Sequence, residues 1–186
     1  MPPRAIITPT VLALLGTLAA QARSQAPSAA DSLNDLHDLS RYVGTFPCVN
    51  GLLRSPTLRR AVAALLGPVD AANYGEYLEN PNCGKIERKD GYLVLDLFFA
   101  HSGGFSSLIL VRERDAVMFV FWLRGEVGYQ QDHVYGPRPV PPAVLHIAER
   151  NMNEGWGHVA CFTPQADSLA IDLYRRGDPE TGICKP

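Results

Sequence analysis

The residues best suited to chemistry in this chain are His101 and Ser102, which precede the pair Gly103-Gly104. A histidine beside a serine suggests nucleophilic catalysis, in which the imidazole takes the proton of the attacking hydroxyl. However, adjacent side chains in a turn seldom point at each other, and no Gly-x-Ser-x-Gly motif is present to expose a serine on a sharp turn. We therefore do not assign Ser102 as a nucleophile.

Residue types that form other kinds of site are scattered along the chain. The histidines and cysteines lack the spacings of a zinc site, although His158 and Cys161 come close to one. The carboxylates are spread out, so no pair can be assigned to glycosidic acid–base chemistry. Phosphate loops and dinucleotide fingerprints are missing as well. We therefore expect no metal, no cofactor and no catalytic residue, and a protein that is not an enzyme.

What remains is the loop that carries His101. Two strongly apolar runs, 92–99 and 105–112, flank it and have the Val, Leu, Ile and Phe content of strands. A pre-ordered loop on a stiff hairpin loses little entropy when it enters a cleft of another protein, and an imidazole there can hydrogen-bond to catalytic carboxylates. The alternative is an ordinary polar loop that uses its glycines to turn. The predicted partner-binding loop consists of Ala100, His101, Ser102, Gly103, Gly104 and Phe105.

The elements around this loop predict an α+β fold, an antiparallel β-sheet meander flanked by helices. A third apolar run, 116–123, follows the turn at Glu113-Arg114-Asp115, and its two apolar sides place it centrally in the sheet or under a helix. The first run alternates, so we expect its Leu93 face to be core and its Asp96 face to be partly exposed. Asp90-Gly91 is typical of a two-residue hairpin turn, which would pair 85–89 with the first run.

Three segments have helical signals. Ser55 can cap a helix that starts at Pro56 and ends at Gly67, and 68–78 can add further turns capped by Asp70. Leucines at three-residue spacing predict a short helix within 33–39. Another helix is expected over 143–153, ending at Gly155. The proline-rich segment 128–142 is expected to be an irregular surface connection, followed by short strands at 158–162 and 168–174.

The N-terminal segment has the order of a secretory signal peptide. Arg4 precedes an apolar run over 5–20, and the small-x-small site Ala20-Gln21-Ala22 predicts cleavage after Ala22. An uncleaved membrane anchor is the alternative, but Pro9 interrupts this run and it is short for a span. The expected organisation is a signal peptide over 1–22, a flexible neck over 23–40 and a single domain over 41–186.

Four cysteines, Cys48, Cys83, Cys161 and Cys184, follow the signal segment. An even number of cysteines in an exported chain favours two disulfides. Of the three pairings that are open, we favour Cys48 with Cys83 and Cys161 with Cys184, because each closes a loop of modest length. The first bridge would tie the helices to the start of the sheet.

The charge of the chain excludes some classes of partner. The chain has 17 Lys and Arg against 19 Asp and Glu, and loss of residues 1–22 removes one Arg. No basic cluster exceeds two residues in a row, whereas nucleic acid needs a basic stripe, so we expect no nucleic-acid partner. No other segment approaches spanning length, so we expect no membrane span after signal cleavage.

The order of helix, strand, histidine-bearing loop and strands resembles the inhibitor of vertebrate lysozyme family, periplasmic proteins in which helices flank an antiparallel sheet. The family loop, Cys-Lys-Pro-His-Asp-Cys followed by Gly, inserts its histidine into the lysozyme active site. Here His101 and Gly104 match that loop, while Phe98 and Gly103 replace its two cysteines. The resemblance covers residues 52–125. It implies a periplasmic inhibitor whose partner is a peptidoglycan hydrolase.

Three hypotheses follow. The first is an inhibitor of a lysozyme-like glycosidase or of a peptidoglycan amidase delivered by a competitor, which would make this chain an immunity protein. The second is a periplasmic small-ligand-binding or envelope structural module, and the third is a hydrolase that sets His101 or His158 beside a carboxylate or thiol. The sequence leaves the oligomeric state, monomer or homodimer, open. In the second hypothesis a groove for an apolar ligand is lined by Trp122, Tyr129, Tyr135 and Trp156.

Overall fold

The computed structural model of the chain describes residues 33–98, 106–123, 134–155, 158–164 and 169–175. Within these ranges six strands form one antiparallel sheet and two more form a separate pair, so the expected α+β class is confirmed. The elements are η1 (Leu36–Tyr42), η2 (Leu52–Arg54), α2 (Pro56–Tyr77), β1 (Asn82–Cys83), β2 (Glu87–Lys89), β3 (Tyr92–Phe98), β4 (Ser106–Arg112), β5 (Met118–Leu123), β6 (Val134–Tyr135), α3 (Pro142–Gly155), β7 (His158–Pro164) and β8 (Leu169–Arg175).

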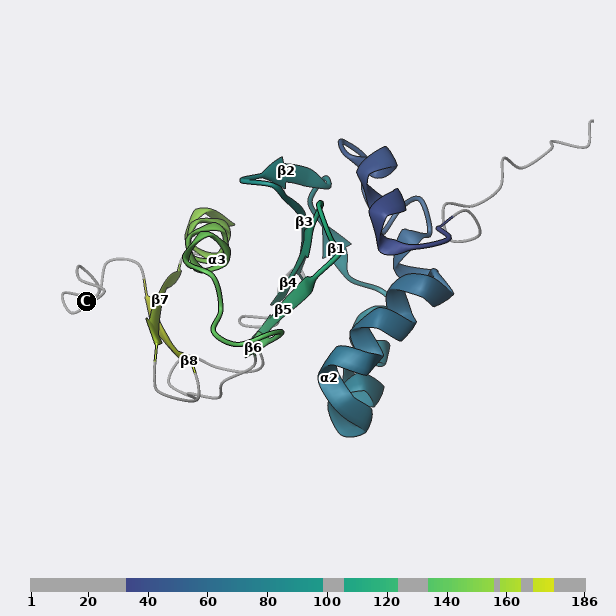
Figure 1. The fold of residues 1–186 in the computed structure, drawn as a ribbon. Coiled ribbons are helices and arrows are strands. Elements are labelled where there is room, and N and C mark those ends of the chain that lie inside the picture. The colour runs from purple at the N-terminus through teal and green to yellow at the C-terminus, as the bar shows by residue number, and fades with distance from the viewer. Residues whose placement is uncertain (1–32, 99–105, 124–133, 156–157, 165–168, 176–186) are drawn as a thin grey trace, which may run out of the picture.

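Helices cover both faces of the larger sheet. Figure 1 shows α2 and η1 on one side of β3–β5, α3 on the other side, and the β7–β8 pair beyond α3. This layering follows from the strands, because β4 and β5 are buried on both faces. Leu93, Leu95 and Leu97 join the core under α2, whereas Tyr92 and Val94 join the core under α3.

The expected exposure of the second face of β3 is therefore wrong for Tyr92 and Val94, which are buried. Alternation along one strand shows that the two faces differ, but it does not show that a second helix covers the more polar face. Exposure persists only at the end of the strand, where Asp96 and Phe98 are half-buried. This end of β3 bounds the candidate site described below.

The turn between β2 and β3 has the predicted form. Asp90 and Gly91 have φ angles of 49° and 79°, and Lys89 pairs directly with Tyr92. Both turn residues thus adopt the left-handed conformation that a two-residue hairpin of this kind requires. The register of the hairpin is fixed by this turn, which places Glu87 opposite Val94.

Helix α2 consists of two helical segments that meet at a kink. Gly67 has φ 77° and ψ 171°, and Pro68 begins the second segment, which buries Tyr74, Tyr77 and Leu78 as expected. The predicted cap at Asp70 is wrong because Pro68 already starts the helix, and the Asp70 carboxylate instead accepts a hydrogen bond of 2.8 Å from the Tyr135 hydroxyl. Ser55 occupies the N-cap position of α2, but its side chain makes no capping hydrogen bond.

Residues 33–40, which belong to the expected neck, are among the described residues. Leu33 and Leu39 are buried in the core, and Asp35 and Asp38 form a capping box at the start of the short helix η1. The short helix expected from the leucine spacing is therefore present. Its burial places the second half of the expected neck, 33–40, within the packed body.

The connection predicted to be irregular contains a strand. In β6, Val134 and Tyr135 pair with Phe121 and Val120 of β5. Four prolines and two glycines lie within 128–142, a composition that favours an irregular segment. The pairing nevertheless satisfies backbone groups that would otherwise be left open at the edge of β5. Further along, α3 ends at Gly155 as predicted, and the two predicted strands are present as β7 and β8, which pair with each other.

The disulfide between Cys48 and Cys83 is present, with a Cα–Cα distance of 6.0 Å. The backbone N–H of Cys48 also donates a hydrogen bond of 3.2 Å to the Cys83 sulfur. The bridge connects the segment before α2 to strand β1, which pairs with the end of β3. The second predicted bridge, from Cys161 to Cys184, falls outside the described residues.

We expect the double variant Cys48→Ser/Cys83→Ser to lose about 3 kcal/mol of unfolding free energy. The reason is that the bridge closes a loop with a sequence separation of 35 residues, which restricts the unfolded chain. Urea unfolding of both proteins without reductant measures this difference. An unchanged midpoint and slope would contradict it.

We expect Gly136→Ala to destabilise the protein by about 2 kcal/mol or more, a magnitude typical of overpacking in a core. Gly136 has φ 148°, and a Cβ there would lie 2.5 Å from Cδ1 of the buried Phe119. Gly75→Ala in α2 is the matched control, because its Cβ meets no atom within 4 Å and alanine favours a helix. Thermal unfolding should show a loss only for Gly136→Ala, and equal midpoints for the two variants would refute this account.

Candidate functional site

The predicted partner-binding loop, 100–105, lies outside the described residues, but both strands that flank it are described. Strands β3 and β4 pair over their whole length, and Phe98 lies opposite Ser106 in the last pair. Ser106 in turn pairs with Leu123 of β5. The segment that carries His101 therefore starts and ends on neighbouring strands of a sheet that is buried on both faces.

The disulfide braces this end of the sheet. Cys83 pairs with Leu97, and Asn82 pairs with Phe98, the final residue of β3. The bond from Cys83 to Cys48 thus fixes the outer neighbour of β3 one residue pair away from the segment 99–105. In addition, the Tyr77 hydroxyl donates a hydrogen bond of 2.9 Å to the Leu97 carbonyl from the α2 side.

Of the four residues predicted to line an aromatic groove, Trp122, Tyr129, Tyr135 and Trp156, the prediction is wrong for Trp122, which lies in the core. Trp122 is buried and packs edge-on against Tyr74, with ring centroids 4.9 Å apart. Tyr135 is half-buried and packs against the same core. Trp122 therefore belongs to the core beneath α2, because a strand apolar on both sides presents its aromatic residues to a helix rather than to a ligand. Tyr129 and Trp156 are not among the described residues.

Tyr74 and Tyr77 complete this aromatic cluster. Their rings stack with centroids 5.5 Å apart, and the Tyr74 hydroxyl shares a hydrogen bond with Ser107 of β4. Burial is the main cause that raises the pKa of both phenols well above the ordinary value. Both hydroxyls consequently stay protonated, which suits a structural role for the cluster.

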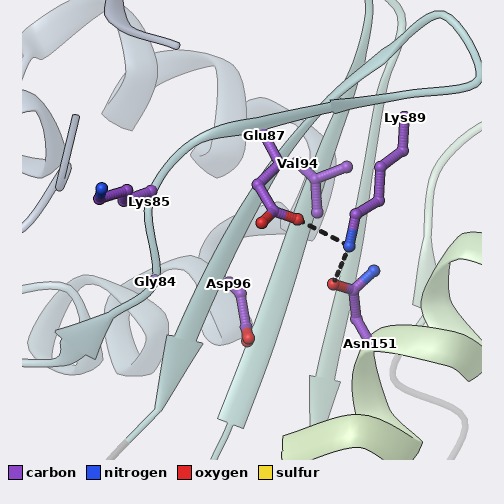
Figure 2. A pocket seen from close by; sticks show the side chains of 7 residues that line it. All are labelled: Gly84, Lys85, Glu87, Lys89, Val94, Asp96 and Asn151. Atoms are coloured by element: carbon purple, nitrogen blue, oxygen red, sulfur yellow. Dashed lines mark hydrogen bonds and ion pairs between the residues drawn. The ribbon is translucent and has the colours of Figure 1, made fainter. Parts of the chain in front are cut away.

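A cleft of about 250 Å³ opens on the opposite face, between the edge of the sheet and α3. Figure 2 shows the cleft with the side chains that surround it. Its walls combine two lysines, two carboxylates, one amide and a single apolar side chain. The lining residues are Gly84, Lys85, Glu87, Lys89, Val94, Asp96 and Asn151.

An irregular stretch of the sheet edge forms one wall of the cleft. Cys83 pairs with Leu97 and Glu87 pairs with Val94, so three residues, 84–86, lie opposite two residues of β3, 95–96. This extra residue is the arrangement of a β-bulge, a feature that often occurs next to functional sites. The Gly84 N–H still donates to the Asp96 carbonyl at 3.0 Å, whereas Ile86 hydrogen-bonds to Gly44 and Thr45.

Asp96 is the half-buried acid of the cleft. Burial is the largest cause that raises its pKa, to about 6, with a smaller lowering by the Lys89 ammonium and a smaller raising by Glu87. Its side chain has no hydrogen-bond partner among the described residues. Carboxylates with a raised pKa inside a cleft are frequent at functional sites, although structural acids can share this property.

Lys89 is held on the other side of the cleft. Its ammonium lies 2.7 Å from a Glu87 oxygen and donates a hydrogen bond of 3.0 Å to the Asn151 carbonyl oxygen. Asn151 donates its own amide N–H to the Ile147 carbonyl at 2.7 Å. Glu87, Lys89 and Asn151 therefore form a connected network between β2 and α3, and Figure 2 shows Asp96 outside it.

Sequence reasoning missed this cleft, although one signal pointed to it. Asp96 is the single charged residue in the run from Tyr92 to Phe98, and by itself this charge indicates only solvent exposure. Asn151 is 55 residues further along the chain, so its position opposite the β2–β3 hairpin follows from the packing of α3. Neither residue has a short-range motif.

Other kinds of site find no support in the part of the chain that the structure describes. No three residues of the His, Cys, Asp and Glu types gather there as metal ligands. His37 and His146 are both exposed, and His37 makes a contact of 3.1 Å with the Glu113 carbonyl through Nδ1. Among the same residues, no helix combines the length and the apolar character needed to cross a membrane.

We expect Asp96→Asn to stabilise the protein by about 2 kcal/mol at pH 7.5. The folded chain holds a proton with a pKa of about 6, against an ordinary value of 3.8, so wild-type stability should fall as the pH rises from about 4 to about 6. Asparagine removes the cost of ionising the buried group, so this fall should disappear. Urea unfolding at pH 4.5 and pH 7.5 tests both statements, and a parallel pH profile for the two proteins would contradict them.

Comparisons with known proteins give no match for this chain. No protein-family model, no curated protein and no solved structure is similar to it at a significant level. Within the described residues, the end of β3 and β4 next to the disulfide and the Asp96 cleft are the two features that suggest a function.

Proposed function

We propose that this chain is an exported protein that inhibits a cell-wall hydrolase by inserting the His101 loop into the active-site cleft of that enzyme. The observation that carries the proposal is the brace at the base of the loop. The Cys48–Cys83 disulfide holds the neighbour of β3 beside Leu97, directly before the segment 99–105. A stiff base reduces the entropy that the loop loses on binding.

The Cys48–Cys83 disulfide also bears on a difference between this chain and the family that it resembles. In that family two cysteines close the loop itself, and here Phe98 and Gly103 stand in their place. The disulfide of this chain instead clamps the strand next to the loop, and helices cover the flanking strands on both faces. We infer that rigidity comes from the base of the hairpin rather than from a bond within the loop.

Export is part of the same proposal. A disulfide is rare in a reducing cytosol and common in periplasmic and secreted proteins. The charged start and the apolar run over 5–20 supply the matching signal peptide. Together they favour the periplasm as the place where the protein meets a peptidoglycan hydrolase, either a lysozyme-like glycosidase or an amidase delivered by a competitor.

We expect His101→Ala to weaken inhibition by about 1–3 kcal/mol, the magnitude of a binding hot spot, which corresponds to an increase of about 5-fold to 150-fold in the inhibition constant. His146→Ala is the matched control, because His146 is exposed on α3 and lies outside the proposed loop. The measurement is inhibition of a panel of lysozymes and peptidoglycan amidases by the purified proteins.

Two results would remove the proposal. The first is that no hydrolase of the panel is inhibited and none forms a complex with the protein on gel filtration. The second is that His101→Ala and His146→Ala inhibit equally well. If inhibition is found, the variant without Cys48 and Cys83 should inhibit less strongly under conditions in which it remains folded.

A further inference from the structure

We propose that the cleft between the β2–β3 hairpin and α3 binds a small organic cation, a primary ammonium or guanidinium on a short apolar stem, with Asp96 as its counterion. This site is independent of the proposed inhibitory loop. It is formed by Gly84 at the bulge, Val94 and Asp96 on β3, and Asn151 on α3.

Asp96 is the acid of the cleft that makes no direct ion pair with a described residue, although the nearby Lys89 ammonium attracts it. Glu87 and Lys89 neutralise each other at 2.7 Å, and Asn151 uses its oxygen on Lys89 and its N–H on Ile147. The Asp96 carboxylate receives no hydrogen bond from any described residue, although it is ionised at neutral pH because its pKa is about 6. A half-buried carboxylate without donors gains most from a ligand that brings both N–H groups and positive charge.

The second lysine of the cleft does not fill this role. Lys85 places its ammonium 5.5 Å from the centre of the Phe46 ring, which is a cation–π contact. Figure 2 shows its side chain extending away from the Asp96 carboxylate. Lys89 is therefore the lysine of the cleft that could act as a counterion for Asp96. Its ammonium, however, already contacts Glu87 and Asn151.

Size and lining define the rest of the ligand. A volume of about 250 Å³ lies below the range of about 300–1,000 Å³ that is usual for drug-sized ligands, so a small molecule fits better than an oligosaccharide or a lipid. Val94 supplies the one apolar wall, which suits a short alkyl stem. A divalent metal is not favoured, because among the described residues no group of three suitable ligands surrounds the cleft.

The test is a titration of the purified protein with n-butylammonium and n-butylguanidinium, followed by backbone amide NMR. We expect both cations to shift the amide signals of Gly84, Val94 and Asn151 in a saturable manner. Butanol and butyrate have the same stem without the positive charge, and they should leave these signals unchanged. Calcium chloride serves as the metal probe and should also leave them unchanged.

Two variants make the test specific. Asp96→Asn should weaken cation binding at least about tenfold, since it removes a charge-assisted hydrogen bond, while Asp90→Asn removes an exposed carboxylate from the β2–β3 turn and should bind as the wild type does. Asp96→Glu keeps the charge and should retain part of the affinity. Circular dichroism melts confirm that each variant is folded.

Three outcomes would overturn the proposal. One is saturable shifts with butanol or butyrate equal to those with the cations. Another is unchanged cation affinity in folded Asp96→Asn. The third is binding of calcium at these amides at a lower concentration than either organic cation requires. A failure of His101→Ala to affect hydrolase inhibition would leave this proposal untouched, because the two sites are measured separately.

Discussion

The structure depends on one constraint, the need to bury both faces of the strands β3, β4 and β5. Every described residue of β5 is buried, and so is every residue of β4 except its last. A sheet of this kind requires a layer on each side, and the two halves of α2 and the helix α3 provide these layers. The kink at Gly67 lets the second half of α2 bring Tyr74 and Tyr77 over the sheet.

This constraint explains where polar side chains can act. Within the described strands of the large sheet, functional groups are restricted to the ends and edges, because α2 and α3 pack against the two faces. Asp96 lies near the end of β3, at the place where the bulge at 84–86 interrupts the regular edge pairing. The proposed inhibitory loop continues from the same end of the same strand. Rigid strands thus carry both candidate sites at the margin of the core.

Local sequence signals predicted much of this fold. The Asp90-Gly91 turn, the break at Gly67, the end of α3 at Gly155 and the Cys48–Cys83 bridge all depend on neighbouring residues or on loop length, and each is present. Features that depend on distant packing were not predicted. The cover over Tyr92, the pairing of Val134 with Phe121 and the approach of Asn151 to the β2–β3 hairpin all require knowledge of where α3 and β6 lie.

The edge strands of the large sheet are short, and this has a consequence for the behaviour of the protein at high concentration. β1, β2 and β6 contain only two or three residues each, and the bulge interrupts the edge formed by β1 and β2. A long flat edge would present a row of open backbone groups to the strands of another molecule, which is a common route into fibrils. Among the described residues, these edge strands offer only short templates of this kind beside the apolar strands β3, β4 and β5.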